Sequence, residues 1–195
     1  MSANATSVQL IPMTCLHCAT PIPAEEDEMA WVCEKCGQGM QLTSAGLAPL
    51  AVQWASAKAG VIDLKWQPFW SFVGTVRFAK RANFGGRSEP DKLWAEPQRF
   101  FIPAYQLPLR DLETIGAELL KKRLQPTPGS ALGKLANCSL FPADAQQAAE
   151  FVVLTIEAER KDKLKAIEFT IETSEPELWM MPFVGEPRPQ NLVLT

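Results

Sequence analysis

The sequence predicts an α+β protein in which a small N-terminal cysteine-bearing unit precedes a mixed or antiparallel sheet packed by two helices. Three observations predict this class. Four of the five cysteines lie in two Cys-x-x-Cys pairs near the start of the chain. Several later segments alternate apolar and polar residues, as strands do, and two others carry apolar helical faces. We therefore expect the cysteine-bearing unit at 1–42, a linker at 43–60 and the α+β domain at 61–195.

The composition is that of a folded protein. The chain has 195 residues, of which 47% are hydrophobic and 21% charged, so a packed core is expected. The start lacks a basic segment followed by an apolar one, which argues against a standard secretion signal. The longest weakly polar run, 46–57, is shorter than the ~20 residues that span a bilayer. We expect a soluble cytoplasmic protein in a reducing compartment, where clustered cysteines bind metal more often than they form disulfides.

The two cysteine pairs have the spacing of a metal site. Cys15 and Cys18 form the first pair, Cys33 and Cys36 the second, and residues 19–32 separate them. A two-residue gap lets two thiolates of one tight turn reach a single ion, and two such turns complete a tetrahedron of sulfur ligands. Gly37, directly after the last cysteine, suits a turn that needs positive φ. The spacing predicts one structural zinc ion.

The residues around the pairs predict two short strands that flank the metal turns. Trp31 and Val32 lead into the third cysteine, and Met40 and Leu42 alternate after the fourth. Residues 13–42 resemble the zinc-ribbon family in its four-cysteine form. The resemblance implies a structural metal site and leaves the biology open, since zinc ribbons occur in transcription factors, ribosomal proteins, tRNA-handling enzymes and docking adaptors. The remainder resembles uncharacterised bacterial proteins that carry a zinc ribbon, and this resemblance implies no activity.

The cysteine pattern leaves one alternative metal open and argues against catalysis. Rubredoxin-like iron for electron transfer uses the same ligands, although usually with a longer gap between the pairs. His17, the only histidine, is expected to be an exposed turn residue, so the main domain lacks a Ser-His-Asp or Cys-His pair. Four thiolates close the coordination shell, which leaves no position for an activated water. Cys138 is expected to be a small buried residue. We expect a protein that is not an enzyme.

The strands of the main domain follow from β-branched and aromatic residues. The stretch 61–81 predicts one or two strands, with Pro68 marking an edge or bend. Residues 83–92 predict a loop, 99–109 a strand with a proline bend, and 125–137 a connecting loop. Residues 164–173 alternate Ile167, Phe169 and Ile171 with polar residues, which predicts a strand with one wet and one dry face. A short apolar strand follows near 176–189.

Two segments predict helices. In 110–124, four aliphatic residues share one face, Asp111 is the expected N-cap, and basic residues gather at the C-terminal end. The second segment, 141–163, has Pro142 near its start and an apolar stretch dense enough for burial on most sides.

Charge is distributed unevenly along the chain. Residues 65–123 carry 11 basic and 6 acidic side chains, although the whole chain has a formal charge of −3. Within this block, a cluster of cations lies among aromatic residues, namely Arg77, Lys80, Arg81 and Arg87. Ordinary solvated faces explain such a block, and a nucleic-acid patch is the alternative.

We favour a docking or assembly module of a larger intracellular complex, with protein partners and one structural zinc ion.

Overall fold

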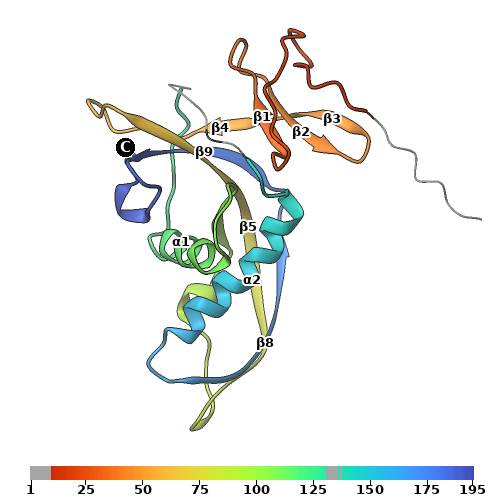
Figure 1. The fold of residues 1–195 in the computed structure, drawn as a ribbon. Coiled ribbons are helices and arrows are strands. Elements are labelled where there is room, and N and C mark those ends of the chain that lie inside the picture. Colours follow the sequence, from red (N-terminus) through yellow and green to blue (C-terminus); the bar gives the residue numbers. More distant parts are fainter. Residues whose placement is uncertain (1–9, 131–135, 137) are drawn as a thin grey trace, which may run out of the picture.

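The structure is a computed structural model that describes residues 10–130, 136 and 138–195. Its strands are β1 (Ala30–Val32), β2 (Gly39–Thr43), β3 (Gly46–Leu50), β4 (Val52–Trp54), β5 (Leu64–Asn83), β6 (Gly86–Arg87), β7 (Gln98–Pro103), β8 (Leu164–Thr173) and β9 (Glu177–Val184). Its helices are α1 (Leu109–Lys121), α2 (Pro142–Ala158) and the short 3₁₀ turns η1 (Lys92–Ala95) and η2 (Pro189–Asn191). The α+β class is confirmed (Figure 1).

A single strand of 20 residues, β5, organises the main sheet. Along one edge, β5 pairs antiparallel with β9 in its first half and with β8 in its second half. Along the other edge β5 pairs with β7 and β6. Gly74 shows this for β7, since it is paired with Gln98 of β7 on one side and with Thr173 of β8 on the other, and Ala82 shows it for β6, since it is paired with both β6 and β8. The only parallel pairing among the described strands joins β4 to β9. The sheet is therefore mixed but mostly antiparallel, and β5 pairs with each of its other described strands except β4.

Pro68 lies inside β5, where its missing N–H redirects the hydrogen bonds of the sheet. The Pro68 carbonyl accepts a hydrogen bond from the Ala104 N–H, just beyond the end of β7. In an antiparallel pair, a residue at position 68 with an N–H would in turn donate a hydrogen bond to the Ala104 carbonyl. The carbonyl instead accepts from the N–H groups of Ser139 and Leu140. The proline therefore ends the β5–β7 pairing and joins the segment before α2 to the sheet edge.

The N-terminal unit forms its own sheet, in the order β1-β2-β3. The expected strands beside Trp31 and Met40 are present as β1 and β2. The stretch 43–60, expected to be a linker, contains more regular structure than expected. Residues 46–50 are the third strand of the N-terminal sheet, and residues 52–54 join the main sheet as β4. Trp54 packs edge-on against Trp66, with ring centroids 5.1 Å apart.

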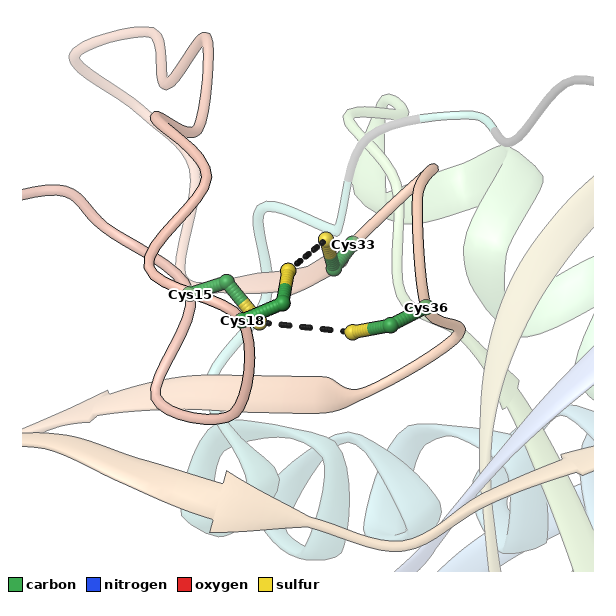
Figure 2. A group of neighbouring side chains, drawn as sticks. All are labelled: Cys15, Cys18, Cys33 and Cys36. Carbon is green, nitrogen blue, oxygen red and sulfur yellow. Dashed lines mark hydrogen bonds between the residues drawn. The ribbon is translucent and has the colours of Figure 1, made fainter.

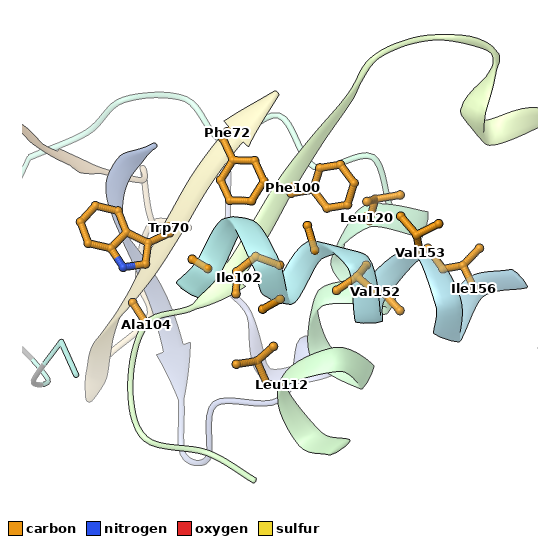
Figure 3. Close-up of a cluster of buried hydrophobic side chains, with 14 of the residues drawn as sticks. Trp70, Phe72, Phe100, Ile102, Ala104, Leu112, Leu120, Val152, Val153 and Ile156 are labelled. Atoms are coloured by element: carbon orange, nitrogen blue, oxygen red, sulfur yellow. The ribbon is translucent and has the colours of Figure 1, made fainter. Parts of the chain in front are cut away.

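Both helices pack against the main sheet, in agreement with the sequence. Figure 3 shows Trp70 and Phe72 from β5, and Phe100 and Ile102 from β7, against side chains of α1 and α2. Asp111 was expected to cap α1, but the cap is Pro108, and Asp111 lies in the first turn, where its charge favours the positive end of the helix. The segment 131–135 and residue 137, within the expected connecting loop, lie outside the described residues.

A second buried cluster lies on the opposite face of β5, because neighbouring residues of a strand point to opposite faces. Phe69, adjacent to Trp70 of the first cluster, stacks on Phe183 with a centroid separation of 5.9 Å. Ile115 and Leu119 of α1 pack into the same cluster, and the C-terminal segment contributes Leu194. The first half of β5 is therefore buried on both faces, which explains its almost continuous run of apolar residues.

A β-bulge reverses the alternation in the second half of β5. Phe78 is paired with Phe169, whereas Lys80 is paired with the adjacent Glu168, so Ala79 is an extra residue in β5. An extra residue exchanges the two faces for every side chain that follows it. As a result, Arg81 points into the protein and is 3% exposed.

Arg81 is the centre of a buried ion network. Its Nε donates to Glu157 of α2, its Nη2 donates to Asp162 at 2.8 Å, and its Nη1 donates to Asp162 and to Ser88. The Glu157 carboxylate also accepts from the Arg160 guanidinium, the Asp91 N–H and the Trp94 Nε1–H. Both oxygens of the buried carboxylate are therefore satisfied, as a charge without solvent requires.

The pKa of Asp162 makes part of this stability dependent on pH. The hydrogen bond from Arg81 is the main cause that lowers this pKa to about 2, with further contributions from Arg160 and Asn83. The folded pKa lies below the unfolded value of about 3.9, so the stabilisation is complete above pH ~4 and disappears as the pH falls through about 2. We expect Asp162→Asn to lower the free energy of unfolding at pH 5 to 7, and the difference from wild type to shrink from pH 4 to 2. Urea unfolding followed by circular dichroism measures this difference.

The matched control is Asp63→Asn, at an exposed aspartate with no ion pair among the described residues. It should leave the free energy of unfolding close to that of wild type. A deficit of Asp162→Asn that stays constant down to pH 2 contradicts the assignment of this pKa to the contact with Arg81.

Candidate metal centre

Two turns of matching backbone geometry present the four cysteines. In the first turn, the Ala19 N–H donates to the Cys15 carbonyl, and the Cys15 N–H donates to the Thr20 carbonyl. In the second turn, Gly37 donates to Cys33, and Cys33 donates to Gln38, at the same sequence offsets. Ala19 and Gly37 follow the second cysteine of each pair, and their φ angles are +55° and +75°. The two pairs are therefore two copies of one local structure.

The four sulfur atoms converge on one point. All of them lie within 4.8 Å of one another (Figure 2). The Cys15 and Cys36 Sγ atoms are 3.5 Å apart, and those of Cys18 and Cys33 are 3.6 Å apart. A tetrahedral zinc site with Zn–S bonds of about 2.3 Å requires S···S separations of about 3.8 Å. The cluster is compatible with a zinc-ribbon-like site for one ion, which confirms that the four predicted cysteines come together.

The electrostatics of the cluster fit four ligands of a cation. Hydrogen bonds from the hydroxyl and the N–H of Thr20 lower the pKa of Cys18 to about 6. At the exposed Cys36 the Gln38 N–H acts in the same direction, but partial desolvation within the cluster and hydrogen bonds with the three other thiols outweigh it and raise this pKa to about 12. Four neighbouring thiolates repel one another, so a divalent cation is needed for all four to ionise together. Soft sulfur donors in a tetrahedron select zinc or iron among the common metals.

The N-terminal unit that contains the two cysteine turns and the strands β1 to β3, here called the metal unit, is joined to the main domain through β1. The N–H groups of Met29 and Ala30 both donate to the Cys138 carbonyl, at 2.7 and 3.3 Å. Ala30 also belongs to the hydrophobic cluster of the main domain. Cys138 is buried, as expected, and burial raises the pKa of its thiol to about 12. The role of Cys138 in joining the two parts of the protein therefore rests on its backbone carbonyl, which accepts both hydrogen bonds, and not on its thiol.

A cavity of about 600 Å³ lies between the metal unit and the main sheet. Pro68 of β5 and Leu178 and Met180 of β9 line it from the sheet, and Trp31 of β1 lines it from the metal unit. This apolar lining was not evident from the sequence, because it combines residues that are more than a hundred positions apart.

The same cavity has an acidic part. Glu25, Glu28 and Glu34 line it, against one cation, Lys35. Glu28 is 5% exposed, and its Oε2 accepts from the Trp31 Nε1–H at 2.7 Å and from the Glu25 N–H at 2.8 Å. These bonds orient the loop before β1 and hold a carboxylate in the cavity wall. The run of acidic residues at 25–28 was the sequence signal for this feature, although it predicted only a polar loop.

The structure leaves three of the four residues of the expected basic patch exposed and buries the fourth. Arg77 and Lys80 are exposed and pair with Glu172 and Glu168, at 3.4 and 3.3 Å. Arg87 is exposed on β6. The inclusion of Arg81 was wrong, because the bulge at Ala79 turns its side chain into the protein. His17, in the first metal turn, is exposed as expected.

No protein-family model, curated protein or solved structure matches this chain. The resemblance to a zinc ribbon therefore rests on the cysteine cluster itself. Within the ranges that the structure describes, no helix combines the length and apolar character needed to cross a membrane.

Proposed function

We propose that the chain is a non-catalytic docking or assembly module of an intracellular protein complex, organised by one structural zinc ion. The observation that carries the metal part is the convergence of four sulfur atoms within 4.8 Å, presented by two matching turns. Bound zinc crosslinks the two turns and supplies folding free energy to a unit too small for a sufficient core of its own. Four protein ligands complete the coordination shell, which supports a structural role over a catalytic one.

Metal analysis tests the zinc assignment. We expect the protein, purified without added metal, to carry one zinc ion per chain and to be colourless. Cobalt substitution should give the intense visible absorption of a tetrahedral thiolate site. A red protein that bleaches on reduction is instead the result expected for rubredoxin-like iron, and a site that contains water overturns the non-catalytic proposal.

The docking part is supported by the cavity beside the metal unit. Its lining combines an apolar surface with three glutamates and a single lysine. This combination is complementary to a peptide segment that carries aliphatic and basic side chains. We propose such a segment of a protein partner as the occupant. The nucleic-acid alternative has less support, because Arg81 is buried and Arg77 and Lys80 pair with acidic residues.

Selection of random displayed peptides on the full zinc-loaded chain tests the docking proposal. We expect the selected peptides to be enriched in Lys or Arg beside aliphatic residues. Glu25→Lys/Glu34→Lys, which reverses charge in the cavity, should weaken their binding at least about tenfold. The matched control is Glu26→Lys/Asp27→Lys, which makes the same charge change in the loop that carries Glu25 but outside the cavity lining. The zinc content of both double variants is verified first. Equal losses of peptide affinity in the two variants, or selected peptides that are not enriched in Lys or Arg beside aliphatic residues, contradict the proposed occupant.

A further inference from the structure

A hairpin lies at the end of the molecule opposite the metal unit (Figure 1). β5 and β6 are joined by a tight turn, in which Phe84 is 76% exposed. The turn has a defined geometry, since the Asn83 side chain accepts a hydrogen bond from the Gly85 N–H at 2.8 Å and Gly86 has a φ of +122°. A large apolar side chain is therefore held at the apex of the hairpin, where it contributes little to the core.

The buried ion network fixes this hairpin to the loop between α2 and β8. Arg81, from the hairpin, is bonded to Glu157 and to Asp162 of that loop, and Asn83 pairs with Leu164. Replacing a buried ion network with apolar residues is often neutral or stabilising, so its presence is better explained by a geometry that it specifies than by stability alone. Here it specifies that the hairpin tip and the loop form one rigid end.

This end is strongly basic. Four exposed cations of the hairpin, the loop and the start of β8 have no ion-pair partner among the residues that the structure describes: Arg87, Lys161, Lys163 and Lys165. Asp162 pairs with Arg81 and the exposed Glu159 pairs with Lys121, which leaves Glu89 as the exposed acid of these segments without an ion pair among the described residues. The whole chain has a formal charge of −3, so these unpaired cations around the hairpin contrast with the net charge of the chain.

We propose that this end docks the protein reversibly on an anionic lipid surface, with Phe84 entering the headgroup region and the four cations facing the headgroups. A projecting aromatic side chain surrounded by cations matches a surface that is charged outside and apolar immediately beneath. A nucleic-acid strand instead needs a groove that follows its phosphates and a platform on which bases stack. The apex of a two-residue turn offers neither. A single apolar side chain with a basic patch gives weak, reversible binding.

Sedimentation of the full zinc-loaded chain with lipid vesicles tests this proposal. We expect binding to vesicles of 30% phosphatidylserine in phosphatidylcholine, and at least about tenfold weaker binding to pure phosphatidylcholine or in 500 mM salt. Phe84→Ala should weaken binding roughly tenfold, while Phe84→Leu should retain most of it, because the contribution is apolar burial. Lys163→Glu/Lys165→Glu should reduce binding to the level seen with neutral vesicles.

Matched variants separate the hairpin tip from general effects. Phe151→Ala removes an aromatic side chain that is 41% exposed on α2, and Lys58→Glu/Arg110→Glu makes the same charge change at exposed cations outside the tip. Both should bind anionic vesicles like wild type. Equal binding to neutral and anionic vesicles, or equal losses in the control variants, overturns the proposal. Binding of a single-stranded 20-nucleotide probe that depends on Phe84, without vesicle binding, also overturns it in favour of nucleic acid.

Discussion

Cys33→Ser is expected to abolish stoichiometric zinc binding and unfold the β1–β3 sheet, while α1 and α2 remain folded. The loss is large because structural zinc supplies on the order of 10–16 kcal/mol of apparent binding free energy. The main domain survives because its core is formed by β5, β7 and the two helices. Metal analysis measures the first effect. Circular dichroism and hydrogen exchange of the helices measure the second.

Cys138→Ser is the control for this change, since Cys138 is buried in the main domain and lies outside the sulfur cluster. It should keep one zinc ion per chain, whatever it costs in stability. A complete collapse of the helical signal in Cys33→Ser contradicts the independence of the main domain. That outcome would mean that the contact of Met29 and Ala30 with the Cys138 carbonyl is essential for the main fold.

Arg81→Met is expected to destabilise the main domain by about 3–5 kcal/mol, because it leaves the buried carboxylate of Glu157 without its main countercharge. Denaturant unfolding of the zinc-loaded protein measures the effect. Adding Glu157→Gln should restore part of the stability, since the amide is neutral and its oxygen still accepts from Asp91 and Trp94. A double variant no more stable than Arg81→Met contradicts the explanation by unpaired charge.

Arg77→Met is the matched control on the same strand. Arg77 pairs with Glu172, but both side chains are about two-thirds exposed, at 66% and 69%. Exposed ion pairs contribute about 0–1 kcal/mol, so this variant should unfold close to wild type. Equal losses at positions 77 and 81 contradict the burial that the bulge imposes.

The sequence predicted the features that depend on local spacing. The metal site followed from four cysteines because each turn is a local structure, and both helices followed from their apolar periodicity. The role of Arg81 did not follow, because a single extra residue at Ala79 reverses the face on which it lies. The strand β4 and the cavity beside Trp31 were also missed. The strand β4 depends on pairing with β9, and the cavity is lined in part by β9 side chains, and sequence alone does not show which distant segments will meet.

The topology of β5 determines the order in which the two halves of the protein can form during synthesis. Leu64 of β5 pairs with Val184 of β9, so the central strand must wait for almost the whole chain before its last neighbour arrives. The cysteine turns need only the first few dozen residues. On the ribosome, the metal unit is therefore expected to close long before the sheet, and the apolar β5 then relies on the remaining chain, or on a chaperone, to shield it.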